Sequence, residues 1–145
     1  MMKFFKMICL LFLMGLASKS FAQEERNYYL YKGTVEKMPI TFFLVETISG
    51  CPKKYYSGIY QYDKLSNWLS LNSTNNQEGH MILVEHHLTG ILNLQKKKET
   101  LNGIWISPDG KRVLKVTLKE VLMKSSTKEA YLDKYHDLEY QLNDC

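Results

Sequence analysis

The alternation of apolar and polar residues is most regular over residues 101–118. In the second half of this segment Leu114, Val116 and Leu118 alternate with polar side chains, a period of two that is typical of strands with one buried face. Pro108-Asp109-Gly110 lies between the halves, where proline favours the first turn corner and glycine tolerates positive φ. The segment therefore predicts an antiparallel hairpin.

Similar runs, separated by turn residues, predict six further strands. The second and fifth of these runs are apolar on both faces, so we expect both of their faces to be covered. Four glycines lie within the predicted strands, three in these runs and one in the hairpin, and they predict bends in the sheet: Gly33, Gly58, Gly90 and Gly103. We therefore predict an all-β antiparallel meander of about eight strands, curled or closed into a small barrel. The six runs are Asn27–Val35, Pro39–Val45, Tyr55–Tyr62, Asn67–Leu71, His80–His86 and Leu88–Gln95.

The segment after Lys124 carries two competing patterns. Ser126 and Glu129 fit a capping box, and Tyr131, Leu132 and Tyr135 would share one helical face. Residues 138–142 instead alternate like a strand. We predict a short C-terminal helix over residues 127–136 and an extended end, with an all-helical tail as the alternative.

Residues 1–22 have the layout of an export signal. Lys3 and Lys6 precede an apolar run over Met7–Ala17, and Ser20-Phe21-Ala22 forms a small-x-small cleavage site. The run is shorter than the roughly 20 residues of a membrane-spanning helix, so we expect no membrane anchor. We predict cleavage near Ala22, a periplasmic or secreted protein, and one β-barrel-like domain over residues 23–145.

Charge and cysteine content change this picture in two ways. Three of the 19 lysine and arginine residues and none of the 15 acidic residues lie in the signal, so the rest of the chain is nearly neutral and a nucleic-acid partner is not expected. The basic run Lys96-Lys97-Lys98 is predicted to be a solvated hairpin tip. We expect Cys51 and Cys145 to form a disulfide in an oxidising compartment; unpaired thiols or an intermolecular bridge are the alternatives.

Two resemblances follow from short motifs. The chain resembles uncharacterised small exported bacterial β-meander proteins, which implies the fold and no activity. It also resembles the envelope β-barrel inhibitors of lysozyme, whose inhibitory loop carries Ser-Gly-x-x-Tyr; Ser57-Gly58-Ile59-Tyr60 has one residue fewer. The first resemblance is carried by Tyr56-Ser57-Gly58-Ile59-Tyr60, Asn67-Trp68, Leu83-Val84-Glu85, Thr89-Gly90 and Asn102-Gly103-Ile104-Trp105.

Candidate catalytic chemistry is sparse. His80, Glu85, His86 and His87 suggest a metal cluster, but a strand would hold His80 and His86 roughly 20 Å apart and point His86 and His87 to opposite faces. We therefore predict no metal and no other cofactor. The sequence contains no Gly-x-Ser-x-Gly motif. Single carboxylates are scattered along the chain, and two of them could converge in space: Glu36, Glu46, Asp63, Glu78, Glu85 and Asp109.

Aromatic residues are the remaining signal. Ten tyrosines and two tryptophans serve equally as good strand formers and as stacking surfaces with a polar group. We choose Tyr56, Tyr60, Tyr62 and Trp105 as candidate ligand-binding residues. The functional prediction is an exported, non-enzymatic binding module for a small molecule, a glycan or a protein; the alternatives are an inhibitor of a lysozyme-like hydrolase and a carboxylate-dependent hydrolase.

Overall fold

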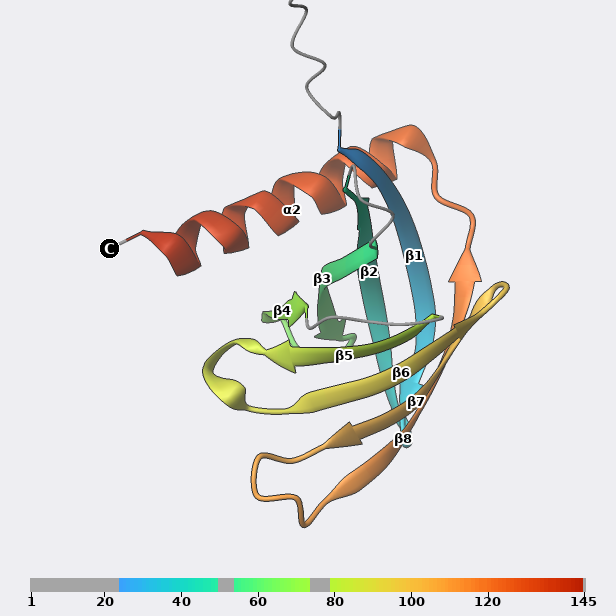
Figure 1. The fold of residues 1–145 in the computed structure, drawn as a ribbon, viewed down its shortest axis with the longest axis vertical. Coiled ribbons are helices and arrows are strands. Elements are labelled where there is room, and N and C mark those ends of the chain that lie inside the picture. The colour runs from blue at the N-terminus through green and yellow to red at the C-terminus, as the bar shows by residue number, and fades with distance from the viewer. Residues whose placement is uncertain (1–23, 50–53, 74–78, 145) are drawn as a thin grey trace, which may run out of the picture.

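The computed structural model describes residues 24–49, 54–73 and 79–144 of the 145-residue chain. Eight antiparallel strands form a closed barrel, which confirms the predicted all-β meander; of the two shapes that the sequence left open, curled or closed, the sheet is closed. A single long helix crosses one side of the barrel (Figure 1). The elements are β1 (Glu25–Val35), β2 (Met38–Ile48), β3 (Lys54–Tyr62), β4 (Trp68–Ser73), β5 (His80–Glu85), the 3₁₀ turn η1 (His86–Leu88), β6 (Ile91–Lys97), β7 (Thr100–Ile106), β8 (Val113–Val121) and α2 (Ser125–Asn143).

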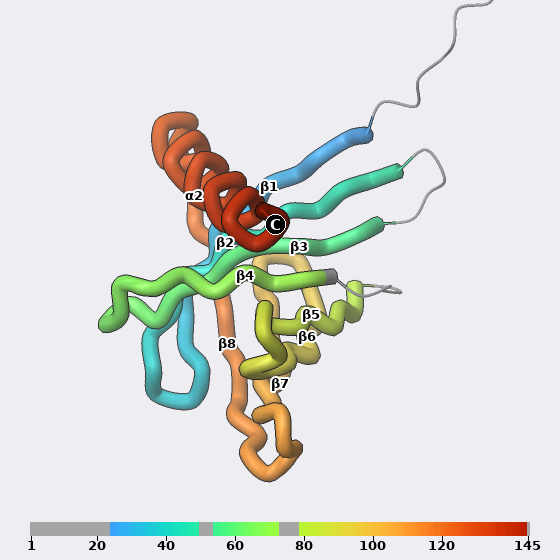
Figure 2. Tube along the Cα trace, turned by 90° about the vertical axis from the view of Figure 1, so that its left-hand side faces the viewer, coloured from blue at the N-terminus to red at the C-terminus, as the bar shows by residue number. Residues whose placement is uncertain are grey.

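Each strand pairs with the next one in the sequence, and β8 returns to pair with β1. The closing ladder runs from Leu30 opposite Val121 to Val35 opposite Val116. Figure 2 shows β1, β2 and β3 side by side near the helix, with β7 and β8 forming the lower end of the barrel. A closed sheet of this kind leaves no unpaired edge strand.

The hairpin of β7 and β8 forms as predicted. Trp105 pairs with Leu114 and Leu101 with Leu118, so the alternating apolar residues of both strands point into the barrel. Gly110 has φ of 70°, which places the left-handed residue of the turn where the sequence indicated it.

The barrel interior is filled by side chains, as expected for eight strands. Every second residue of each strand contributes to one continuous core, and most of these side chains are completely buried. The core members are Tyr31, Val35, Ile40, Phe42, Leu44, Tyr56, Tyr60, Leu71, Met81, Leu83, Leu92, Leu94, Leu101, Trp105, Val116 and Leu118.

A second apolar cluster lies outside the barrel, between α2 and the outer faces of the first strands. Phe43 of β2 stacks on Tyr131 of α2, with ring centroids 5.6 Å apart, and Trp68 meets the same tyrosine edge-on. Tyr135 is the buried residue of the helix. This cover explains why β2 is apolar on both faces, as predicted.

The helix differs from the prediction in its length and in its start. It continues to Asn143, so the expected extended end after residue 136 is wrong and the all-helical alternative holds. Leu138 belongs to the cluster against the barrel, whereas Tyr140 is 71% exposed. Residues two positions apart point to nearly opposite sides of a helix, so this difference in exposure is expected. The N-cap is Lys124 without a side-chain cap hydrogen bond, so the predicted capping box does not form.

Three further expectations fail around β5 and β6. Ile82 is 44% exposed, so β5 is not covered on both faces. Strand β5 ends at Glu85, and the following 3₁₀ turn places the rings of His86 and His87 4.0 Å apart rather than on opposite faces. Lys96 is not part of a solvated tip: its Nζ lies 3.2 Å from the centre of the Tyr29 ring.

At three of the strand glycines the neighbouring strand comes too close for a side chain. A Cβ at Gly33, Gly58 or Gly103 would overlap the backbone of that strand, at Thr117, Phe43 or Asn93. The bends predicted at these glycines stay a prediction. The proposed signal, its cleavage site near Ala22, and both Cys51 and Cys145 lie outside the described residues. Among the described residues, no helix has the length and apolarity needed to cross a membrane.

Candidate functional site

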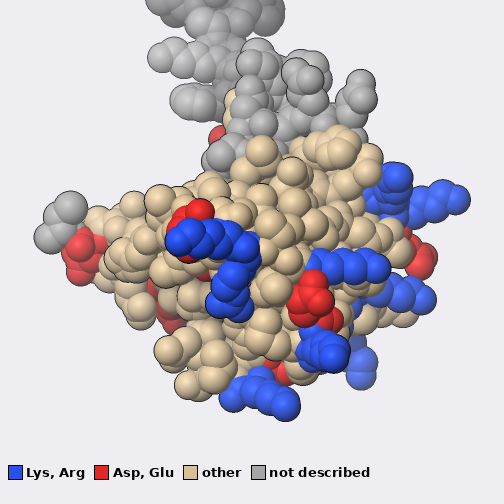
Figure 3. Space-filling view, turned by 90° about the horizontal axis from the view of Figure 1, so that it is seen from below, with Lys and Arg blue, Asp and Glu red and all other residues tan. Residues whose placement is uncertain are grey.

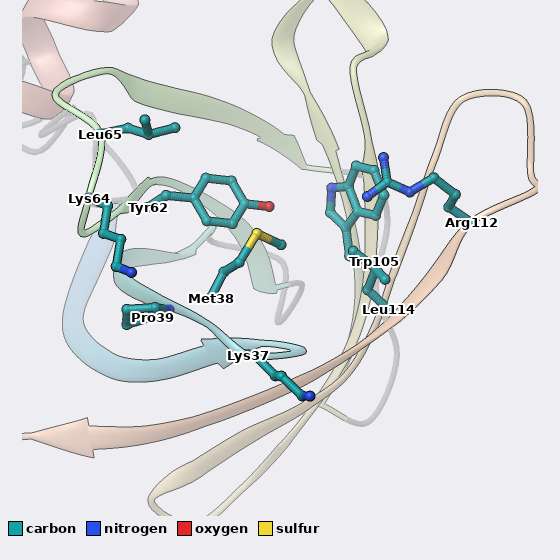
Figure 4. Close-up of a pocket in the computed structure, with 9 residues that line it drawn as sticks. All are labelled: Lys37, Met38, Pro39, Tyr62, Lys64, Leu65, Trp105, Arg112 and Leu114. Carbon is teal, nitrogen blue, oxygen red and sulfur yellow. The ribbon is translucent and has the colours of Figure 1, made fainter.

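A cavity of about 460 Å³ opens at one mouth of the barrel (Figure 4). Three turns and strand ends converge there: the β1–β2 turn, the end of β3 with the segment that follows, and the β7–β8 hairpin. Its wall is mainly apolar and aromatic, and its charged members are all cationic. The lining residues are Lys37, Met38, Pro39, Tyr62, Lys64, Leu65, Trp105, Arg112 and Leu114.

Two aromatic residues form opposite walls of this cavity. In Figure 4 the hydroxyl of Tyr62 points toward the indole of Trp105, and the side chain of Met38 rises between them. Trp105 is 9% exposed and belongs to the barrel core, while Tyr62 is half-buried and packs against that core. The Arg112 guanidinium lies 5.8 Å from the Trp105 ring on the outer side.

One buried carboxylate, that of Glu85 at the end of β5, lies behind the aromatic walls. Glu85 is 3% exposed. Its Oε1 accepts hydrogen bonds from Trp105 Nε1, at 2.6 Å, and from the Tyr60 hydroxyl. Its Oε2 accepts one from Thr89 Oγ1 at 2.7 Å. Tyr62 packs edge-on against the ring of Tyr60, with ring centroids 5.6 Å apart.

This network fixes the geometry of the cavity floor. Burial, followed by the hydrogen bond to Glu85, raises the pKa of Tyr60 well above its usual range, so Tyr60 remains a donor at neutral pH. Gly90 makes room for the network: a Cβ there would overlap Trp105 Nε1 and lie 2.7 Å from Glu85 Oε1. The hydrogen bond to Glu85 thus holds Trp105 in place before any ligand arrives, and Tyr62 packs against the equally anchored ring of Tyr60.

The carboxylates next to the cavity are turned away from it by local hydrogen bonds. Glu36 accepts the backbone N–H of Lys115 at 2.6 Å, and Asp63 accepts the hydroxyl of Thr41 at 2.8 Å. Asp109 accepts the Ser107 hydroxyl at 2.6 Å; this bond and the following backbone N–H groups lower the pKa of the Asp109 carboxyl. No carboxylate lines the cavity.

A second buried carboxylate, Glu46, lies near the opposite end of β2. It accepts hydrogen bonds from Tyr56, at 2.9 Å, and from Asn27, at 3.3 Å. Burial alone would raise the pKa of Glu46, but these bonds and the charges of Lys96 and Lys54 outweigh burial and lower it. The barrel therefore has a polar, internally paired end and an open, mainly apolar end.

A further cavity of about 400 Å³ separates the C-terminal half of α2 from β3 and β4 and is lined mostly by polar groups. There the Ser57 Oγ and Tyr135 OH atoms are 2.8 Å apart, and Tyr135 donates to Glu139. Burial raises the pKa of Tyr135 to about 12. This chain of hydrogen bonds attaches the helix to β3.

The four candidate binding residues fall at three places in the barrel interior. Tyr62 and Trp105 line the same cavity, and Tyr60 lies one hydrogen bond deeper. Tyr56 lies at the other end, bonded to Glu46. No group of three histidine, cysteine, aspartate or glutamate side chains in the described part of the chain is arranged to hold a metal ion.

Sequence reasoning missed the residues that complete the site. Glu85 has the same strand parity as Met81 and Leu83, which point inward, so the period of two could have placed its carboxylate inside the barrel. Lys37, Lys64 and Arg112 lie in three separate turns. No spacing rule brings those turns together until the barrel closes.

Comparisons of the chain with protein-family models, with curated proteins and with solved structures found no match.

Proposed function

We propose that this protein binds one small ligand with an apolar or aromatic body in the cavity between Tyr62 and Trp105, and that it acts as a non-enzymatic binding module. The observation that carries the proposal is the cavity itself. Its volume of about 460 Å³ falls in the range of small-molecule sites, which combine apolar walls with a few fixed polar groups. The export signal predicted for residues 1–22 would place this module in the periplasm or outside the cell.

The support from the residues is pre-organisation. Trp105 is held by its hydrogen bond to Glu85 and Tyr62 by packing on Tyr60, so ligand binding need not immobilise them and loses less entropy. Tyrosine and tryptophan also provide a stacking face with few rotatable bonds. A closed barrel holds three turns around the cavity, and the ladder hydrogen bonds limit how far those turns can separate.

The two alternative functions find less support. A glycosidase-like hydrolase needs two carboxylates facing one cleft. Glu46 and Glu85 contact Tyr56 and Tyr60, which are four residues apart on β3 or about 13 Å along the strand, and neither lines the cavity. A lysozyme inhibitor acting through Ser57-Gly58-Ile59-Tyr60 needs an exposed loop, whereas this segment lies in β3 and Tyr60 is 0% exposed.

Titration with a neutral aromatic probe tests the proposal. N-phenyl-1-naphthylamine fluoresces in apolar surroundings, and we expect saturable binding of one probe per chain. Leu65→Gln should weaken binding by about fivefold, since losing contact with one leucine costs on the order of 1 kcal/mol. Leu88→Gln is the matched control, because Leu88 is 56% exposed against 60% for Leu65 and lies outside the cavity. Absence of saturable binding, or equal effects of the two substitutions, would overturn the proposal.

A further inference from the structure

The cavity has a second chemical property besides its apolar walls. Three of its nine lining residues are cations and none is an acid: Lys37 from the β1–β2 turn, Lys64 from the segment after β3, and Arg112 from the β7–β8 hairpin. Seen from below, lysine and arginine side chains project around a broad uncharged area of the surface, with acidic side chains beside some of them (Figure 3). The described residues that line the cavity therefore carry charge of one sign, although acids lie in the same turns and the chain without its predicted signal is nearly neutral.

These three cations have no ion-pair partner within the described parts of the protein. Each turn also holds one carboxylate that is hydrogen-bonded within the fold: Glu36 accepts a backbone N–H, Asp63 the hydroxyl of Thr41, and Asp109 the hydroxyl of Ser107. The Ser107 bond, and to a smaller extent the charge of Arg112, lowers the pKa of Asp109. Among the described residues that line the cavity there are three cations and no acid.

From this arrangement we infer that the ligand is an amphipathic organic anion, with an apolar body against Trp105 and Leu114 and an anionic head at the mouth, where the lining side chains Lys37, Lys64 and Arg112 supply positive charge. This inference rests on the proposed function and names its ligand class. Lysine offers a point charge, whereas the arginine guanidinium presents a planar set of donors that suits a carboxylate, a sulfate or a phosphate. A cationic ligand would face three like charges, and a neutral one would leave them without a partner.

Three compounds with nearly equal straight alkyl tails, of about nine or ten carbons, separate the head group from the body. Decanoate, decan-1-ol and decyltrimethylammonium would each compete with N-phenyl-1-naphthylamine for the cavity at pH 7.5 and low salt. We expect decanoate to bind about tenfold more tightly than decan-1-ol, because each exposed ion pair adds a few-fold at most. Decyltrimethylammonium should bind most weakly. The preference for decanoate should shrink as salt is added, because salt screens exposed charges.

The residues are tested by two charge-matched triple variants. Lys37→Gln, Lys64→Gln and Arg112→Gln together should bring the affinity for decanoate to within about threefold of the affinity for decan-1-ol, both measured on the same variant. The control combines Lys97→Gln, Lys119→Gln and Lys134→Gln, three exposed lysines outside the cavity. It removes the same net charge and should keep the preference. A loss of preference in both variants would show a general effect of net charge and overturn the inference.

The two proposals fail in different ways. If decanoate and decan-1-ol compete equally well with the probe, the cavity binds ligands but does not select anions, and the inference is wrong while the proposed function stands. If none of the three compounds and no probe binds, the proposed function itself is wrong. Preferential binding of decyltrimethylammonium would also contradict the inference.

Discussion

Replacing Glu85 with leucine should destabilise the protein more than replacing it with glutamine. Leucine removes both acceptor oxygens and leaves Tyr60 OH and Trp105 Nε1 buried without their partner, since these residues are 0% and 9% exposed. A buried donor without a partner costs about 1–3 kcal/mol, so the two together cost about 2–6 kcal/mol. Thr89 is exposed and can turn to water.

Glutamine at the same position keeps one carbonyl oxygen for the two buried donors. Its amide can donate to the hydroxyl oxygen of Thr89, which is able to accept. A hydrogen bond to a neutral acceptor is worth roughly 1 kcal/mol less than one to a charged acceptor. We therefore expect Glu85→Gln to lose about 1–2 kcal/mol, less than Glu85→Leu loses.

Urea unfolding of both variants, followed by circular dichroism, measures this difference as a shift in midpoint at constant slope. Trp105 fluorescence in the folded state reports whether the indole has lost its fixed environment. The reasoning is refuted if Glu85→Leu unfolds at the midpoint of the wild type, or if glutamine and leucine destabilise the protein equally.

Three further predictions follow from the same contacts. Gly90→Ala should weaken probe binding and lower the unfolding midpoint, because the new methyl group displaces Trp105. Gly110→Ala is the comparison: the space around Gly110 is open but its φ is 70°, so the substitution should lower the midpoint without altering binding. Tyr31→Phe should leave stability unchanged or raise it in urea unfolding, because the buried hydroxyl lacks a hydrogen-bond partner within the described residues; a loss above about 1 kcal/mol would count against this. Tyr135 has a pKa of about 12 in the folded state against about 10 in the unfolded state, so its contribution to stability is complete below pH 10 and is lost as the pH rises from 10 through 12. Tyr135→Phe should therefore reduce the fall in unfolding free energy at alkaline pH. An unchanged fall would contradict the raised pKa of Tyr135.

The period of two was sufficient to predict an antiparallel meander, because one face of each strand had to be buried, but it left open whether the sheet curls or closes. The same period applies to two charged residues: Glu46 follows Phe42 and Leu44 on the inward face of β2, and Lys96 follows Leu92 and Leu94 on β6. Glu46 is buried and bonded to Tyr56, and Lys96 is half-buried over the ring of Tyr29. Their charge favoured the surface, whereas their position in the alternation gives the correct face.

The local sequence pattern could not decide the structure of the end of the C-terminal helix. Leu138 and Leu142 are four apart, which fits a helix, but the alternation with Tyr140 fits a strand equally well. Tertiary packing favours the helix, because in a helix Tyr131 and Tyr135 are covered by the outer face of β2 and β3. The cation arrangement was likewise invisible in the sequence, because it depends on three turns meeting at one mouth.

The central claim is that an apolar ligand with an anionic head occupies the cavity beside Trp105. The chain has two tryptophans, and Trp68 lies in the cluster under α2, outside the cavity. Decanoate carrying bromine at its tail quenches an indole that it touches. With Trp68→Phe, leaving Trp105 as the sole tryptophan, the account predicts saturable quenching at one ligand per chain. Quenching of Trp68 alone, measured with Trp105→Phe, or of neither tryptophan would contradict it.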